Sequence, residues 1–253
     1  MKVVLFCGGY GVRMGSATRR IPKPMLPVGD EPILVHIMRY YAAWGHREFI
    51  LCLGHRGEVI EEYFVDHPMT NGPEGWRISC VHTGLDTTIA ERLTKVDHLL
   101  GDDREFLATY GDGLTDAPLD QLIAHFRATG KTALFLAVRP RFHAHVVQLD
   151  DAGMVHGVES MDGTDILING GFFVFKREIM DSIRPGEELV DEPFRRLIAR
   201  GELIGRRYDG FWAPMDTLKD KQYLDCLAAA GNPPWVVAHV PGQGGLGDAP
   251  VLA

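Results

Sequence analysis

Apolar and polar positions change their period several times along the chain. In the first half, short runs that are almost entirely apolar, such as KVVLFC (residues 2–7), are typical of strands buried on both faces. Segments such as PILVHIMRYYAAWG (32–45) place apolar residues three or four positions apart, with Pro near the start and Gly at the end, which predicts a helix. By these patterns we expect strands at 2–7, 48–54, 77–84, 105–113 and 132–138, and helices at 32–45, 57–67, 89–101 and 118–130.

The alternation of strands and helices predicts the fold class. A βαβαβαβαβ series is typical of an α/β protein with a mostly parallel, Rossmann-like, doubly wound sheet flanked by helices on both faces. The second half differs, because residues 146–160 alternate around an Asp-Asp-Ala-Gly turn, which predicts a small antiparallel hairpin. The remaining segments of this half are a strand at 170–175, helical pieces near 177–183 and 191–200, a strand leading into a loop over 202–216, and a helix at 217–231.

The distribution of these segments predicts one domain over residues 1–240. Its N-terminal half (1–130) has the pattern of a nucleotide-binding unit, and its C-terminal half (131–230) would hold a second substrate, the acceptor. The tail, 241–253, is rich in Gly and Pro, and we expect it to be disordered.

Composition and charge exclude several classes of protein. The longest apolar run is six residues (Ala133–Val138), whereas a helix that crosses a bilayer needs roughly 20, so we expect no membrane association. The four cysteines lack the spacing of metal or redox motifs, which favours reduced, mostly buried thiols. With no signal-peptide pattern at the N-terminus, we expect a cytoplasmic protein. The net charge of −8 argues against a nucleic-acid partner, which would require a broad basic surface.

A glycine-rich turn follows the first strand and is the first candidate for chemistry. Gly8, Gly9 and Gly11 can adopt positive φ and bring backbone N–H groups close to an anion. Two familiar phosphate motifs are absent: no G-x-x-x-x-G-K-[ST] sequence is present, and Met14 occupies the third glycine position of G-x-G-x-x-G. The segment that follows contains four prolines within residues 15–32 and is therefore expected to be mostly loop.

Basic residues gather beside this turn, although the whole chain is acidic. They are Arg13, Arg19, Arg20 and Lys23. Lys23 lies between two prolines, which stiffen the backbone on both sides, and a preorganised cation stabilises charge without reorganisation. A solvated basic loop is the alternative, but the strand and glycines before it favour a site for phosphate groups.

Several motifs in register resemble those of one enzyme family. GGYGVRM…PKPMLPVGDEPIL (8–34) resembles the G-G-x-G-T-R-L…P-K-P-[ML] signature of the sugar-1-phosphate nucleotidylyltransferases. EFILCLG, TYGDGLTDAPL, AVRP, INGGFFVF and DGFWAPMDTLKDK follow in the expected order, so that the likeness covers roughly residues 1–228 and is greatest to the glucose-1-phosphate cytidylyltransferase branch. The resemblance implies the nucleotide-diphospho-sugar transferase type of fold. It also implies an Mg²⁺-dependent enzyme that condenses an NTP, with CTP as the first expectation, and a sugar-1-phosphate such as glucose 1-phosphate into an NDP-sugar and pyrophosphate.

The resemblance also implies roles for individual residues. Asp112 follows a strand at its carboxyl end, where open α/β sheets bind ligands, and Asp216 precedes a helix; by spacing alone they could be a turn residue and a helix N-cap. By analogy with the family, the catalytic residues are Arg13, Lys23 and Asp112, and the nucleotide-binding residues are Gly8, Gly9, Gly11, Arg13, Lys23, Arg92 and Gly111. The sugar-phosphate-binding residues are Glu159, Asn169, Gly170 and Gly171, and the metal ligands are Asp112 and Asp216. The relatives further suggest a homo-oligomer.

The chain departs from the family pattern on the acceptor side. Val12 replaces the usual Thr, and Ser160 replaces the lysine of an E-K-P stretch that holds the sugar phosphate in the family. Four basic residues are candidates for taking over that charge: Arg139, Arg141, His143 and His145. His143 and His145 could be read as a metal pair, but residues two apart in a strand simply share a face, and we favour that reading.

These departures leave the exact substrates open. The same chemistry could use UTP, dTTP or GTP, and an unusual sugar, amino-sugar, cyclitol or non-sugar phosphate as acceptor. A regulator that binds nucleotides or nucleotide sugars without turnover is the alternative from another class. A dinucleotide-dependent oxidoreductase is a weaker alternative, because Met14 breaks its fingerprint.

Overall fold

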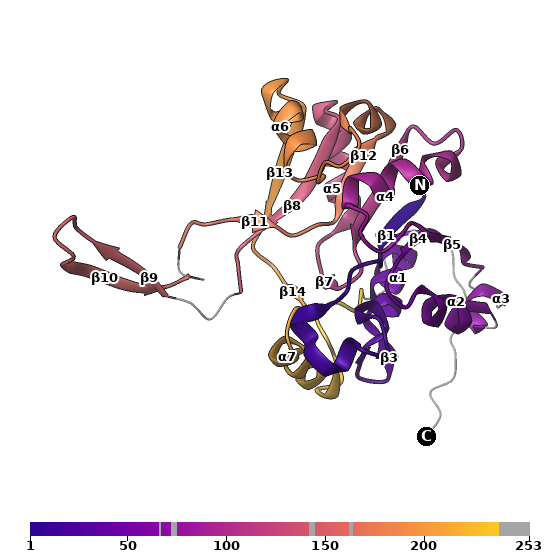
Figure 1. Cartoon of the computed structure of the whole chain (residues 1–253), viewed down its shortest axis with the longest axis horizontal. Coiled ribbons are helices and arrows are strands. Elements are labelled where there is room, and N and C mark those ends of the chain that lie inside the picture. The colour runs from indigo at the N-terminus through magenta and orange to yellow at the C-terminus, as the bar shows by residue number, and fades with distance from the viewer. Residues whose placement is uncertain (66, 72–74, 142–144, 162–163, 238–253) are drawn as a thin grey trace.

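A mixed, mostly parallel sheet forms the centre of the computed structural model of the chain, which describes residues 1–237 apart from 66, 72–74, 142–144 and 162–163 (Figure 1). Strand β1 (Val3–Phe6) lies between β4 (Glu48–Leu53) and β6 (Glu105–Tyr110), and both pairings are parallel. The remaining strands of this sheet are β5 (Arg77–His82), β8 (Ala133–Val138), β11 (Ile168–Asn169), β12 (Phe173–Lys176) and β13 (Leu203–Tyr208). Their order is β11-β8-β12-β6-β1-β4-β5, with β13 parallel to β8.

Alternate residues of the central strands enter two separate cores. Val3 and Leu5 of β1 face one core, whereas Val4 and Phe6 face the other, as the period of two dictates. The first core is covered by α1 (Ile33–Ala43), α2 (Gly57–Val65), α5 (Leu119–Thr129) and α7 (Leu218–Ala229). The second is covered by α4 (Ile89–Val96), η5 (Arg177–Ser182) and α6 (Glu192–Ala199). The predicted α/β fold with helices on both faces is therefore confirmed.

The structure adds three features to the sequence prediction. Strand β12 inserts between β6 and β8 and runs antiparallel to both, because the apolar pattern that identified a strand does not specify its direction. The segment expected to be mostly loop contains the 3₁₀ turns η1 (Val12–Thr18) and η2 (Lys23–Met25) and the short pair β2 (Pro27–Val28) and β3 (Glu31–Pro32). Two further short helices are α3 (Pro68–Asn71) and η3 (Asp97–Leu100), the second of which tightens the end of α4.

The predicted antiparallel hairpin extends away from the body of the molecule (Figure 1). It consists of β9 (His145–Leu149) and β10 (Val155–Ser160). A second short antiparallel pair, β7 (Gly113–Thr115) with β14 (Trp212–Pro214), lies within the body and positions the site described below.

Two predictions from composition can be compared with this fold. All four cysteines are free, but only Cys7 and Cys52 are buried, while Cys80 is half-buried and Cys226 on α7 is exposed. In the part of the chain that the structure describes, no helix combines the length and the apolar character that a bilayer crossing requires.

Candidate active site

A cavity of about 490 Å³ opens at the carboxyl ends of β1 and β6. After β1 the chain adds β4 and β5 on one side, and it then crosses to the other side of β1 to form β6. Ligands of open α/β sheets bind at such a reversal of strand order, because the loops after the two strands separate there. The glycine turn (8–11), Arg13, Lys23, Gly111, Asp112 and Asp216 all line this cavity.

Lys23 is the centre of the charged groups in the cavity. Its Nζ donates hydrogen bonds to Asp112 Oδ2 at 2.6 Å and to Asp216 Oδ1 at 2.7 Å. Burial alone would lower the pKa of Lys23, but the charges and hydrogen bonds of the two carboxylates outweigh it and raise the pKa above its ordinary value. Arg13, which is 66% exposed, contributes a second cation, with Nη2 2.8 Å from Asp216 Oδ1.

The pairing of β7 with β14 brings the two aspartates together. Gly113 pairs with Pro214, and the backbone N–H of Met215 donates to the carbonyl of Asp112 at 2.8 Å. Asp216 is not the N-cap of α7, because Thr217 takes that place in a capping box with Asp220. The carboxylate of Asp216 is therefore left to face the cavity.

Arg92 packs against the glycine turn, and its guanidinium forms hydrogen bonds within the protein. It is buried, and it donates to the carbonyls of Gly8 and Leu85, both at 3.3 Å, and of Leu53 at 3.2 Å. A Cβ at Gly8 would collide with this guanidinium unless the Arg92 side chain moved. Burial lowers the pKa of Arg92, while hydrogen bonds to carbonyls replace the lost water. Arg92 thus shapes the turn from below, and its contact with a nucleotide stays a prediction.

The structure places most of the predicted acceptor-side residues in one turn. Asn169 Nδ2 donates to the hydroxyl of Tyr110, which lines the cavity, at 3.2 Å, and Asn169 Oδ1 accepts from the N–H of Gly171. The carbonyl of Gly170 accepts from Trp212 Nε1 at 2.9 Å. Glu159 is different: it is exposed on the projecting hairpin, where Gln148 Nε2 donates to it. The structure therefore brings Asn169, Gly170 and Gly171 close to the cavity but does not bring Glu159 there.

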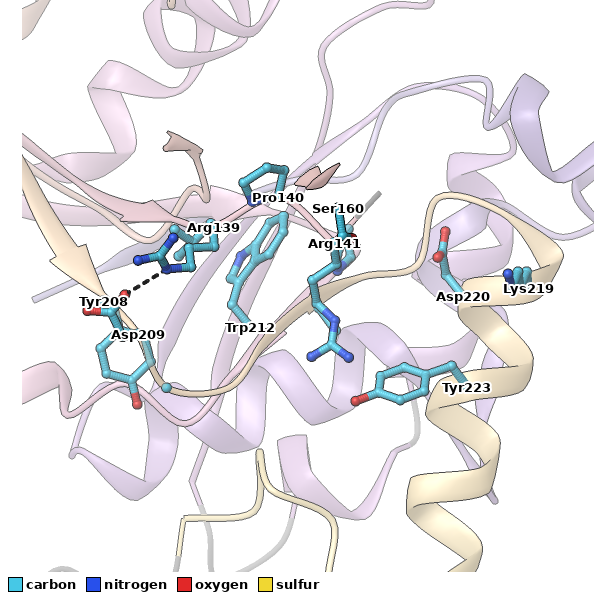
Figure 2. A pocket seen from close by; sticks show the side chains of 14 residues that line it. Arg139, Pro140, Arg141, Ser160, Tyr208, Asp209, Trp212, Lys219, Asp220 and Tyr223 are labelled. Carbon is cyan, nitrogen blue, oxygen red and sulfur yellow. Dashed lines mark hydrogen bonds and ion pairs between the residues drawn. The ribbon is translucent and has the colours of Figure 1, made fainter. Parts of the chain in front are cut away.

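Figure 2 shows a second cavity, of about 600 Å³. The segment from Trp212 to Asp220 joins the two cavities, since Trp212, Pro214 and Lys219 line the second cavity and Asp216 lines the first. Of the residues that line it, Arg139, Arg141 and Ser160 were expected in this region from the sequence, whereas Tyr208, Trp212, Lys219 and Tyr223 were not. Trp212 and Lys219 could have been predicted from the sequence, because both belong to the DGFWAPMDTLKDK motif.

The residues at the first cavity fit a magnesium ion that arrives with a triphosphate. Asp112 and Asp216 converge on one cation position, which Lys23 Nζ holds in this structure. No cluster of three or more His, Cys, Asp or Glu suited to a metal occurs among the described residues. Two carboxylates, completed by phosphate oxygens and water, are a typical set of ligands for Mg²⁺. Of the possible histidine pair, His143 lies outside the described residues and His145 is exposed on β9.

Comparison with known proteins identifies the family. A family model described as nucleotidyl transferase matches residues 2–212. The chain belongs to the nucleotidyl transferase family. This nucleotidyltransferase is 38% identical to the glucose-1-phosphate cytidylyltransferase of Salmonella typhi, with 93% of this chain and 98% of that protein covered. It is 36% identical to the probable glucose-1-phosphate cytidylyltransferase of Bacillus subtilis, with 94% of this chain and 100% of that protein covered.

Solved structures support the fold of the nucleotidyltransferase independently. A UDP-glucose pyrophosphorylase from Acinetobacter baumanii superposes with a TM-score of 0.72 over 93% of this chain and 95% of that chain, at 18% sequence identity. At this identity the likeness concerns the fold alone. Three predictions are confirmed together: the sugar-1-phosphate nucleotidylyltransferase family, the type of fold, and the enzyme class that releases pyrophosphate.

Proposed function

We propose that this nucleotidyltransferase transfers the cytidylyl group of CTP to glucose 1-phosphate, forming CDP-glucose and pyrophosphate. The observation that carries the proposal is the cluster of Lys23, Asp112 and Asp216 beside a glycine turn, in a chain that matches a glucose-1-phosphate cytidylyltransferase over nearly its whole length. The first cavity would hold CTP, and the second, adjoining cavity would hold the acceptor.

The reaction makes one bond and breaks another at the α-phosphorus of CTP. A phosphate oxygen of glucose 1-phosphate attacks this phosphorus while the bond to the bridging oxygen breaks, and pyrophosphate leaves with the electron pair. Such transfers depend mainly on positioning and on neutralising charge. Lys23, held in place by two carboxylates, would stabilise the charge that develops on the α-phosphate, and Arg13 would bind the departing β- and γ-phosphates.

Asp112 and Asp216 would hold Mg²⁺ when it is bound. The ion would neutralise phosphate charge as a Lewis acid. The N–H groups of Gly8, Gly9 and Gly11 would contact the nucleotide, and Gly111 lets the chain after β6 pass close to it.

A release assay tests the proposal. The protein is incubated with Mg²⁺ and each of CTP, UTP, dTTP and GTP, combined with a panel of sugar, amino-sugar and cyclitol phosphates, and pyrophosphate is measured. We expect the highest kcat/KM for CTP with glucose 1-phosphate, and CDP-glucose as the product by mass spectrometry. A higher kcat/KM with another pair would replace the proposed substrates. Nucleotide binding without pyrophosphate release from any pair would favour a non-catalytic regulator instead.

A further inference from the structure

Arg141 lines the second cavity and has no carboxylate partner among the described residues. It follows β8, and its guanidinium carbon lies 4.6 Å from the centre of the Tyr223 ring on α7. Figure 2 shows the side chain extending between Trp212 and α7 toward Tyr223. Within the described part of the chain, no carboxylate pairs with Arg141. The ring restricts the guanidinium while leaving its N–H groups available to an anion.

The other candidate cations for this role are engaged or lie elsewhere. Arg139 is paired with Asp209 at 3.3 Å and with Asp165 at 3.7 Å, and it also donates to the carbonyl of Thr164. His145 is exposed on the projecting hairpin, and His143 lies outside the described residues. Arg141 is therefore the candidate that lines the cavity and has no carboxylate partner in the part of the chain that the structure describes.

The rest of the cavity is consistent with an anionic group beside Arg141. Lys219, at the start of α7, adds a second exposed cation, and Ser160 adds a hydroxyl that can donate to a phosphate oxygen. Asp220 also lines this cavity, and its Oδ2 accepts from the N–H groups of Asp216 and Thr217. Asp216, which lines the first cavity, lies in sequence between Pro214 and Lys219, which line the second. This short segment therefore connects the second cavity to the reacting centre.

We propose that Arg141, assisted by Lys219, binds the phosphate of the acceptor and thereby supplies the positive charge that Ser160 cannot. This inference rests on the proposed function, since it assigns the acceptor of that reaction to the second cavity. A planar guanidinium binds a phosphate through two parallel hydrogen bonds, so Arg141 would select acceptors that bear a phosphate monoester.

The test separates binding of the acceptor from binding of the donor. In Arg141→Ala we expect the KM for glucose 1-phosphate to rise about 10- to 100-fold, the range for one charged hydrogen-bonding group, while the KM for CTP stays unchanged. Arg206→Ala is the matched control, because Arg206 is an exposed arginine on β13 that is not part of the described lining of either cavity. In Arg141→Lys the KM for glucose 1-phosphate should rise less than in Arg141→Ala. Ser160→Lys, added to Arg141→Ala, should also lower this KM, because it places a cation at the position where the family has its lysine.

A binding measurement keeps this inference distinct from the proposed function. Glucose 1-phosphate is titrated calorimetrically into wild-type protein and Arg141→Ala, each saturated with α,β-methylene-CTP, and inorganic phosphate is titrated in the same way. Weaker binding of these probes to Arg141→Ala supports the inference, even if CTP and glucose 1-phosphate yield no pyrophosphate and the proposed function fails. Equal affinity of the two proteins, or no binding to either, overturns the inference, and pyrophosphate release by wild-type protein would still uphold the function.

Discussion

Lys23 carries its charge in a buried position because two carboxylates compensate it. Its side chain is 10% exposed, and Asp112 and Asp216 accept from the same ammonium. A triphosphate that enters the cavity brings new anions to these groups, and the ammonium is already held inside the cavity that the triphosphate would enter. The prolines on either side of Lys23 in sequence, together with the 3₁₀ turn η2 that contains it, fix the backbone from which this side chain extends.

Removing this charge should abolish most turnover. We expect Lys23→Ala and Asp112→Asn to lower kcat for pyrophosphate release by about two orders of magnitude or more, the scale for one preorganised charge contact. Lys221→Ala is the matched control, because Lys221 makes an ion pair with Asp225 on α7, away from the cavity. A wild-type rate in either variant would remove that residue from the mechanism.

His46 makes the stability of the fold depend on pH. Burial, together with the nearby positive charges of the Met1 amino group and Arg127, lowers the pKa of His46 to about 4 from an ordinary 6.5. The unfolded chain therefore binds this proton at a higher pH than the folded chain does. Stability contributed by neutral His46 should accordingly be lost as pH falls from about 6.5 toward 4.

The variant His46→Gln isolates this effect. Its midpoint of urea unfolding should fall less steeply than that of wild-type protein between pH 6.5 and 4, because glutamine does not titrate. His98→Gln, at an exposed position, serves as the control. Parallel slopes for wild-type protein and His46→Gln would mean that His46 does not have the lowered pKa.

At the scale of elements, the conformation of the turn after β1 depends on Arg92 of α4 as well as on the glycines of the turn. Arg92 comes from α4 and donates to the carbonyls of Gly8, Leu53 and Leu85, which ties the glycine turn to the end of β4 and to the loop after β5. Gly8 and Gly9 are adjacent, but they have different surroundings. Gly8 packs against the Arg92 guanidinium, whereas a Cβ at Gly9 would meet no atom within 4 Å.

This difference predicts that two neighbouring substitutions will affect stability differently. Gly8→Ala should lower the free energy of unfolding by about 1–3 kcal/mol, the cost of overpacking a closed site. Gly9→Ala should leave the unfolding of the ligand-free protein close to that of wild-type protein, because its methyl group points into open space. Urea denaturation of both variants without nucleotide provides the measurement, and equal losses would show that Arg92 does not constrain the turn.

The elements themselves were largely predictable, because their burial pattern is local. The strands at 2–7, 48–54 and 132–138 and the helices at 32–45 and 118–130 agree with β1, β4, β8, α1 and α5 to within two residues at each end. The direction of β12 was not predictable, since a buried strand has the same apolar run in either direction. The capping role of Thr217 was also missed, although the spacing of Thr217 and Asp220 resembles a capping box.

At the scale of the whole molecule, an acidic chain forms a site for acidic substrates by concentrating its cations. The net charge is −8, yet Arg13 and Lys23 meet where the sheet reverses its strand order. Lys23 and Arg13 together neutralise the two carboxylates that would hold Mg²⁺. The fold should therefore not depend on the metal, whereas the proposed reaction should.

Chelation tests both halves of this expectation. EDTA should abolish pyrophosphate release, and excess MgCl₂ should restore it, while the thermal unfolding midpoint of the substrate-free protein stays essentially unchanged. Full activity in EDTA would contradict the assignment of Asp112 and Asp216 as metal ligands. A large fall of the midpoint on chelation would contradict the compensation of these carboxylates by Lys23.

The sequence by itself determined the order of strands and helices, the glycine turn and the stiffened Lys23, because periodic burial and the properties of Gly and Pro act over a few residues. Only the tertiary structure decided which distant groups meet. Lys23 is 89 residues from Asp112 and 193 from Asp216 in the chain, and the β7–β14 pairing is what closes that distance. The same holds for Arg92, which donates to backbone carbonyls and to the Thr83 hydroxyl. It holds also for Arg141, which has no carboxylate partner among the described residues, whereas Arg139 has two. A side chain's partners depend on every element packed around it, and the local pattern of the chain does not contain that information.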